Sequence, residues 1–160
     1  MMDEATLRSA IETLRRAPGL VKEATSGLPA PRHAWKPSPK EFSILENVAH
    51  LHDIEREGYL ARVRRILEEE MPRLPDIDGE RLAIERRYNA RDLGVEVAAF
   101  AAARTETLAI LERTSAGLLG RQGELENVGI VTLEKLIGMM AEHDLGHLRD
   151  IRSVRERAGV

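Results

Sequence analysis

The side chains of this sequence best suited to binding a metal ion are its histidines. His143 and His147 stand four residues apart in the stretch HDLGH, so on a helix both imidazoles would lie on one face and could hold one ion. Among five histidines such a pair also arises by chance, and its alternative interpretation is one hydrogen-bonded and one solvated side chain. A catalytic ion usually takes three protein ligands, so a third must come from another helix.

The run ENVAHLHDIE offers two candidates for the third ligand, His50 and His52. Positions two apart on a helix point about 200° away from each other, so these two imidazoles cannot both face one ion. The apolar stripe of Leu45, Val48 and Tyr59 centres near His52 and favours that residue. A groove beside the core would use His50 instead, and the periodicity leaves both assignments open.

Other catalytic arrangements fit the sequence less well. A di-iron bundle needs Glu-x-x-His motifs, and no glutamate here precedes a histidine by three positions. The stretch HDLGH resembles the H-E-x-x-H motif of zinc proteases with Asp144 in place of Glu, but the accompanying sheet and downstream ligand are not evident. The sequence also contains neither a G-x-S-x-G motif nor a glycine-rich phosphate loop.

Three carboxylates lie near the candidate ligands in the sequence: Asp53, Glu55 and Asp144. Groups of this kind orient metal-bound imidazoles by accepting hydrogen bonds, or act as a general base. The alternative for each of them is a place on a solvated helix face. We predict all three as candidate catalytic residues.

Four segments with apolar residues at three- and four-residue spacing predict the helices that would position these side chains. They cover residues 3–25, 39–70, 92–119 and the chain from 132 onward. Pro18 can kink or interrupt the first of them. Candidate N-caps of the other three are Ser38, Asp92 and Thr132.

Prolines and glycines separate the four predicted helices. They gather in the segments 27–40, 71–91 and 117–129. Strand-like alternation is nowhere sustained, and no repeat of fixed period is present. The sequence therefore predicts an all-α protein, with residues 1–160 forming a single four-helix-bundle domain.

Composition narrows the classes of function. Lys and Arg number 24 against 27 Asp and Glu, so the chain lacks the basic excess of a nonspecific nucleic-acid binder. With no cysteine, it has no disulfide, thiolate metal site or cysteine nucleophile. No run approaches the roughly 18 apolar residues of a membrane helix, and the first residues are acidic and polar. We expect a cytoplasmic protein that binds neither nucleic acid nor membrane.

The order of these motifs resembles the DinB-like superfamily over nearly the whole chain. The relevant branch is described as metal-dependent hydrolases and bacillithiol- or mycothiol-dependent transferases. The stretch WKPSPKEFSILENVAHLHDIE is similar to the family's W-x-P, aromatic residue and His-Leu-x-Asp signature. RRYNARD and FAAARTETLAIL, which includes Arg104, correspond in kind and order. The most specific match is GIVTLEKLIGMMAEHDLGHLRDI, which resembles the closing G-x-x-T-L and H-D-x-x-H-L-x-x-I helix.

The resemblance implies a four-helix bundle of the DinB/YfiT-like type and a divalent ion held by His50, His143 and His147. His50 takes the position of the family's first ligand because it precedes Leu51 and stands three residues before Asp53. Imidazole ligands suit Zn, Ni or Fe. This sequence departs from the common family pattern at four substrate-side positions: Phe42, Gly146, Arg149 and Asp150.

A three-histidine ion with open positions would polarise a substrate or lower the pKa of a bound water or thiol. We therefore expect a metal-dependent enzyme that performs hydrolysis or thiol S-transfer on a small molecule, such as a low-molecular-weight thiol. The resemblance favours S-transfer. One alternative is a noncatalytic, stress-associated bundle that binds a small ligand or a protein partner. Another is an ion that only closes the second and fourth helices together.

Two further expectations concern the whole protein. Apolar residues beyond one face of the first and third helices predict a homodimer; they are Leu20, Val21, Leu28, Val97 and Ile110. Because histidine binds metal only as neutral imidazole, we expect metal occupancy to fall between about pH 7 and pH 5 while the helices persist.

Overall fold

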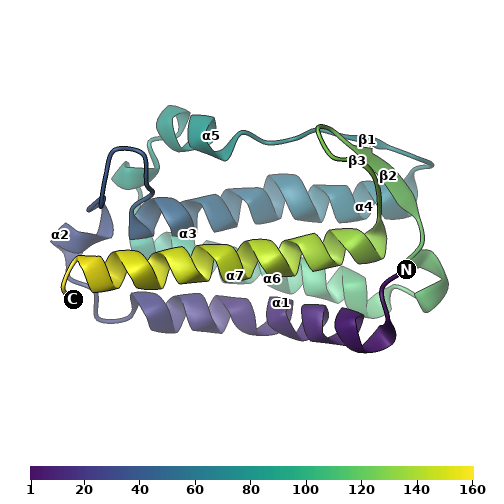
Figure 1. Cartoon of the computed structure of the whole chain (residues 1–160), viewed down its shortest axis with the longest axis horizontal. Helices are drawn as coiled ribbons and strands as arrows, with labels where there is room; N and C mark the ends of the chain where they lie inside the picture. The colour runs from purple at the N-terminus through teal and green to yellow at the C-terminus, as the bar shows by residue number, and fades with distance from the viewer.

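Four long helices run the length of the computed structural model, which describes residues 1–160 (Figure 1). The first is α1 (Glu4–Thr25), the third α6 (Leu93–Arg113) and the fourth α7 (Leu133–Arg157). The second helix consists of α3 (Ile44–Asp53), the π-helical segment η1 (Ile54–Leu60) and α4 (Ala61–Glu68). The predicted four-helix bundle is confirmed. None of the helices is both long and apolar enough to span a membrane.

Side-chain caps determine where the long helices begin. In each case the N-cap side chain accepts a hydrogen bond from a backbone N–H three residues later. The four N-caps are Asp3, Ser43, Asp92 and Thr132. The sequence therefore placed the start of the first, third and fourth helices correctly.

The predicted start of the second helix at residue 39, after Ser38, is wrong. This helix begins at Ile44, because Ser43 and Glu46 form a reciprocal capping box that satisfies two backbone N–H groups. The Ser-x-x-Glu spacing that identifies this start is present in the sequence. The third helix likewise ends at Arg113, earlier than the predicted 119.

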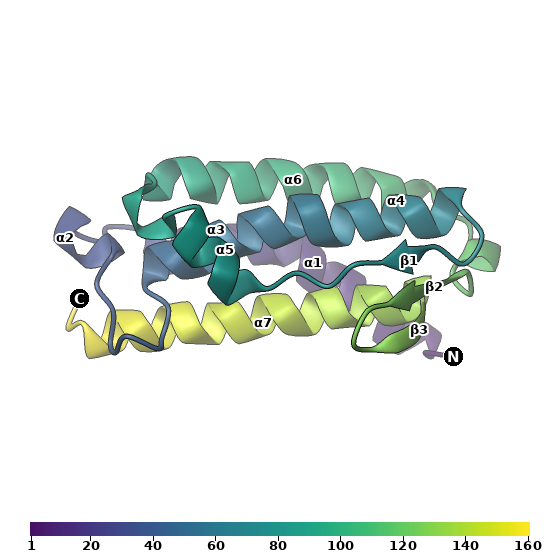
Figure 2. The same cartoon turned by 90° about the horizontal axis from the view of Figure 1, so that it is seen from above.

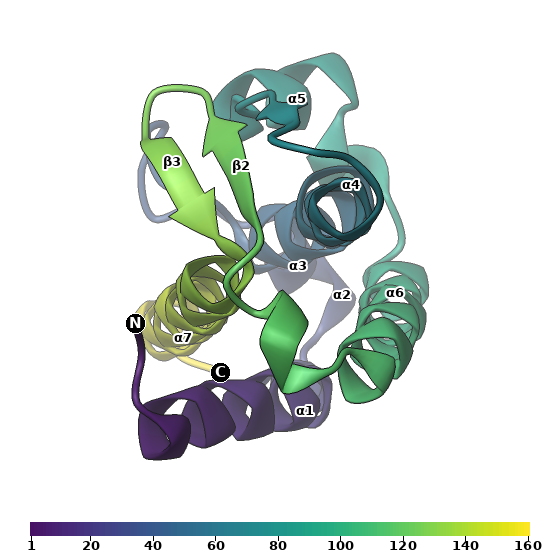
Figure 3. The same ribbon diagram turned by 90° about the vertical axis from the view of Figure 1, so that its right-hand side faces the viewer.

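Seen end-on, the bundle has the order α1, α7, second helix and α6 around its axis (Figure 3). Helices consecutive in the chain, α1 with the second helix and α6 with α7, are therefore diagonal partners. The colour gradient shows that α1 and α7 run in one direction, and the second helix and α6 in the other (Figure 1). Because the second helix and α6 are parallel, the chain must return along the molecule between them.

The return segment, residues 69–92, is called the crossover below. It contains β1 (Arg73–Leu74), α5 (Gly79–Glu85) and the 3-10 turn η2 (Tyr88–Ala90). Viewed from above, its path lies between those of the second helix and α7 (Figure 2). Arg62 of α4 helps to hold it there by donating a 2.8 Å hydrogen bond to the carbonyl of Pro75.

A small sheet near the start of α7 was not expected from the sequence. Strand β1 pairs in parallel with β2 (Gln122–Leu125), and β2 pairs antiparallel with β3 (Gly129–Thr132). Strands of two to four residues are too short for a period of two to be recognised. The turn between β2 and β3 leaves a weak signal in Asn127 and Gly129, both of which have positive φ.

Two further short helical segments are α2 (Ala30–His33) and η3 (Ala116–Leu118).

Helix α1 continues through Pro18, where the sequence allowed a break. Proline has no N–H, so the carbonyl of Leu14, four residues earlier, lacks its helical donor. Nη1 of Arg104 on α6 donates a 2.9 Å hydrogen bond to this carbonyl. A side chain from a neighbouring helix thus replaces the bond that Pro18 cannot make.

Candidate metal centre

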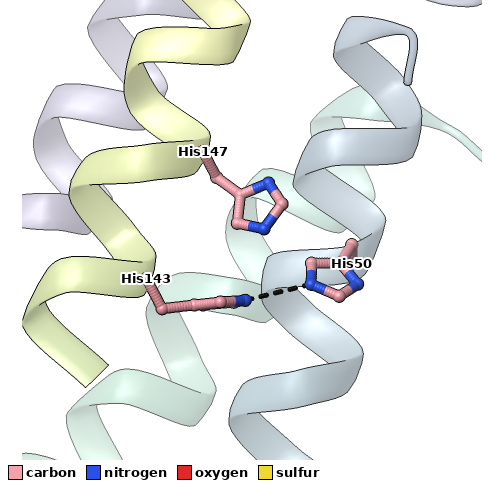
Figure 4. A group of neighbouring side chains, drawn as sticks. All are labelled: His50, His143 and His147. Carbon is pink, nitrogen blue, oxygen red and sulfur yellow. Dashed lines mark hydrogen bonds between the residues drawn. The ribbon is translucent and has the colours of Figure 1, made fainter. Parts of the chain in front are cut away.

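Three imidazoles meet between the second helix and α7 (Figure 4). His50 lies on α3, and His143 and His147 lie one turn apart on α7. One nitrogen from each ring lies within 4.8 Å of the others, and Nε2 of His50 is 3.0 Å from Nε2 of His143. The predicted pair therefore shares one face of α7, and the second helix supplies the third imidazole.

His52 lies outside this group. Its Nδ1 is 2.7 Å from a carboxylate oxygen of Glu96 on α6. The preference for His52 from helical periodicity does not hold, because the second helix packs against α6 as well as α7, and His52 is on the α6 side. The imidazole that the family resemblance indicated, His50, is the one in the group.

Burial keeps the three imidazoles neutral. Burial first, and the charge of a protonated His147 second, lower the pKa of His50 to about 3 and that of His143 to about 2. Burial also lowers the pKa of His147. Neutral imidazole is the form that coordinates a metal ion. The folded protein thus presents three rings in their ligating form at neutral pH.

Asn47 orients the ring of His147. This buried residue (1% exposed) lies one turn before His50 on α3. Its Nδ2 donates to the carbonyl of Ser43, and its Oδ1 accepts a 2.8 Å hydrogen bond from Nδ1 of His147. With the proton on Nδ1, the lone pair of His147 is on Nε2, the nitrogen free to bind an ion.

The ring of His50 packs against Gly79, the first residue of α5. A Cβ added at Gly79 would lie 2.4 Å from Cε1 and 2.6 Å from Nδ1 of His50. These distances are too short for a non-bonded contact. The ring also lies near Phe42, with 5.7 Å between ring centroids. The crossover therefore leaves space for His50 only because residue 79 is glycine.

These residues fit a divalent ion. Tetrahedral zinc with Zn–N bonds of 2.0–2.1 Å separates its ligand nitrogens by about 3.3 Å. The nitrogens of the three rings lie 3.0 to 4.8 Å apart, so small ring rotations suffice to bring them to this spacing. Three neutral imidazoles suit Zn, Ni or Fe and leave coordination positions for water or substrate.

Asp53, a predicted catalytic residue, is held in a polar cluster beside the second helix. Tyr88 donates a 2.7 Å hydrogen bond to one of its oxygens, and Arg86 and Arg91 bind the same carboxylate. Burial alone would raise the pKa of Asp53, but the hydrogen bonds from Tyr88, Arg91 and Arg86 together lower it. The carboxylate is therefore ionised and joins the second helix to the crossover.

The other two predicted catalytic residues, Glu55 and Asp144, share one guanidinium. Arg104 of α6 is fully buried and makes paired hydrogen bonds to both carboxylates, at 2.6 to 3.0 Å. Thr107 donates a further bond to Glu55. Burial raises the pKa of Asp144 to about 6, although Arg104 opposes the rise. Two carboxylates around one guanidinium leave an excess negative charge when both are ionised.

Sequence reasoning missed Asn47 and Gly79 as site residues. The first could have been found, because a residue three positions before His50 lies on the same helix face. Gly79 gives no such signal, since its closeness to His50 depends on how the crossover lies across the bundle.

A cavity of about 740 Å³ opens over His50 and His147. Its walls come from the crossover, from the loop before α3 and from the second half of α7, and most of its lining side chains are polar or charged. Asp53, Glu55 and Asp144 do not line it. The imidazoles of His50 and His147 thus form part of the floor of a polar pocket of the size that holds small molecules.

Fold and site together define an all-α bundle with a candidate three-histidine metal centre. The chain belongs to the DinB superfamily, whose family model matches residues 13–151. Among solved structures it is similar to YfiT from Bacillus subtilis, described as a probable metal-dependent hydrolase with an unusual four-helix bundle topology. The TM-score is 0.90 at 19% sequence identity, covering 99% of this chain and 91% of that chain. At this identity the likeness shows a common fold. No curated protein matches the sequence.

Proposed function

We propose that this protein is a metal-dependent hydrolase of a small molecule. The observation that supports this proposal is the meeting of three neutral imidazoles, from His50, His143 and His147, two of which (His50 and His147) line an open, polar cavity. A divalent ion in such a site supplies a Lewis acid that makes water a better nucleophile near neutral pH. The description of YfiT as a probable metal-dependent hydrolase agrees with this choice.

The chain's own residues would position the ligands and hold the site together. Asn47 keeps the lone pair of His147 on Nε2, and Gly79 leaves room for the ring of His50. Asp53, Glu55 and Asp144 have all their oxygens bonded to donors, and they lie outside the cavity lining. We propose them as positioning residues that fix α3, η1 and α7. Their predicted role as acid or base stays a prediction.

Thiol S-transfer is the second candidate function. The cavity of about 740 Å³ lies within the range of small-molecule sites, and it could hold a low-molecular-weight thiol beside an electrophile. The same neutral ligand set would lower the pKa of a thiol as it does that of water. Measuring the consumption of a thiol distinguishes the two reactions, because S-transfer consumes one and hydrolysis does not.

The first experiment measures metal content after reconstitution with Zn, Ni or Fe. We expect about one ion per chain in the native protein and in the variant His52→Gln. His52 is the control because its ring bonds to Glu96 and lies outside the imidazole group. We expect near-complete loss in His50→Gln, His143→Gln and His147→Gln, because two remaining imidazoles bind the ion far more weakly. The loaded proteins are then assayed on activated esters, with and without added thiols. Absence of metal in the native protein under all three conditions would contradict the proposed function.

A further inference from the structure

The walls of the cavity over the imidazoles are rich in carboxylates. Asp76, Asp78 and Glu80 line it from the crossover, and Asp150 lines it from α7. None of the four takes part in a salt bridge. These four residues are called the acidic wall below.

The remaining charged side chains of the lining do not neutralise the acidic wall. Glu41 is paired with Arg157 at 2.5 Å, so this acid is already balanced. Lys40 is the one basic residue in the lining, and it makes no salt bridge. The nearby Arg62 is directed to the carbonyl of Pro75 and to the ring of Tyr59, outside the lining. Arg62 and Arg81 interact electrostatically with Asp76 and Asp78 and offset part of their charge. Four carboxylates outside any salt bridge against one lysine still leave the cavity lining negative.

Two members of the acidic wall make hydrogen bonds within the protein, and the other two make none. Asp78 caps α5, and Asp76 accepts from the backbone of Ile77 and from Asn127. Glu80 on α5 and Asp150 on α7 line the cavity from two different elements and make no hydrogen bond. Burial lowers the pKa of His147, and the charge of Asp150 opposes this, so that this carboxylate acts electrostatically on a proposed ligand.

The cavity floor offers a separate sign that a ligand binds here. The imidazoles of His50, His143 and His147 converge there, with one nitrogen of each ring within 4.8 Å of the others, and the rings of His50 and His147 line the cavity. Convergent neutral imidazoles at a cavity are an arrangement that binds a ligand, independently of the carboxylates around it. The acidic wall therefore surrounds a site that is already built for a ligand.

We propose that the substrate of this site bears a cationic group, an ammonium or a guanidinium, which the acidic wall selects. This inference rests on the proposed function. Charges of one sign around a cleft concentrate ligands of the opposite sign and repel those of the same sign. An electron-rich reacting group would face the imidazole floor, and the cationic group would lie between Glu80 and Asp150. Anionic small molecules are disfavoured.

The test compares three hydroxamic acids that share one metal-binding group and differ in charge. 4-Aminobutyrohydroxamic acid is cationic, pentanohydroxamic acid neutral and succinic monohydroxamic acid anionic. Each is titrated into the Co(II)-loaded protein, and the visible spectrum of the ion gives the Kd. We expect the cationic compound to bind about tenfold or more tightly than the anionic one at low salt, with a smaller ratio in about 0.5 M salt.

Two double variants show whether the acidic wall causes the preference. Glu80→Gln with Asp150→Asn removes two wall charges without breaking a hydrogen bond, and should reduce the ratio to about threefold or less. Glu68→Gln with Glu70→Gln makes the same change of charge at the exposed end of α4, and should leave the ratio unchanged. Equal binding of the three compounds, or an equal effect of both variants, would overturn the proposal.

Failure of metal binding is distinguished from failure of this inference by the metal-free protein. The same compounds are titrated into it, and binding is read from the imidazole proton resonances of His147. A cationic preference here supports the acidic wall even if no Co(II) binds and the proposed hydrolase is wrong. A Co(II)-loaded protein without charge preference overturns the inference and leaves the proposed function in place.

Discussion

The space that Gly79 leaves for His50 makes residue 79 a sensitive position. We expect Gly79→Ala to weaken metal binding about 10- to 100-fold, the range found when the groups that orient metal ligands are changed. The reason is that the new Cβ would lie 2.4 Å from Cε1 of His50 and force the ring or α5 to move. Competition with a chromogenic chelator measures the affinity, and urea denaturation measures the stability.

Gly146 provides the matched control, since it lies between His143 and His147 on α7. A Cβ there would meet only the flexible end of Arg149, at 3.9 Å. Gly146→Ala should keep the metal affinity and stabilise the helix by about 0.5–1 kcal/mol. Equal affinity in the two alanine variants would show that the crossover adapts to a larger residue 79.

At the residue scale, helical spacing located the two candidate ligands on α7 but not the third. Spacing alone placed His143 and His147 on one face, because that relation is local to a helix. The choice between His50 and His52 depended on which neighbour each face of the second helix meets, α7 or α6, and helix periodicity does not contain that information. The order of motifs along the whole chain did contain it.

At the scale of elements, Arg104 joins η1 to α7 through its salt bridges with Glu55 and Asp144. Arg104→Met should destabilise the protein by about 3–5 kcal/mol, because Glu55 and Asp144 would remain buried without their cation. Chemical denaturation measures the change. Adding Glu55→Met and Asp144→Leu removes the unpaired charges and should recover much of the loss. If the single variant lost less than about 1 kcal/mol, the guanidinium would not be holding these elements together.

The long helices were predictable and the crossover was not. A helix of twenty residues shows its period and its cap in its own sequence, as α1 does with Asp3. The crossover between Glu69 and Asp92 is held by distant contacts, such as Arg62 with Pro75 and β1 with β2. Its short elements therefore leave no recognisable pattern in the sequence. For the same reason the acidic wall and the contact of Gly79 with His50 could not be predicted.

At the scale of the whole molecule, buried imidazoles make the metal-free protein sensitive to acid. The pKa is about 3 for His50 and about 2 for His143 in the folded protein, against the ordinary value of 6.5 for a solvated imidazole. Below pH 6.5 the unfolded chain therefore binds more protons, and each such imidazole costs about 1.4 kcal/mol of unfolding free energy per pH unit. Asp144, with its pKa raised to about 6, partly offsets this because its burial penalty is relieved as pH falls from 6 towards 3.8.

We therefore revise the expectation that the helices persist as the metal is released. The melting temperature of the metal-free protein, followed by circular dichroism, should fall between pH 6.5 and pH 5. In the double variant His50→Gln with His143→Gln this dependence should be much flatter. Identical melting temperatures at pH 7 and pH 5 in the metal-free native protein would contradict the burial of neutral imidazoles.

The residues behind the homodimer expectation lie within the bundle. Val21 and Leu28 are buried in one core cluster, against which Leu20 and Val97 also pack. Ile110 packs against the other cluster. Leu20, Val97 and Ile110 are only partly buried, so the protein's own helices use these apolar faces of α1 and α6 in part, and the homodimer stays a prediction.

The guanidinium of Arg104 also has a consequence for how the protein unfolds. It starts on α6 and binds the Leu14 carbonyl of α1, Glu55 of the second helix and Asp144 of α7. One side chain therefore has a partner on each of the other three long helices. If any one of these separated alone, a buried polar group would lose its partner, so partial opening of the bundle at this level is unfavourable. The four helices are thereby made to open as one cooperative unit, and a three-helix intermediate has no way to keep all of these groups paired.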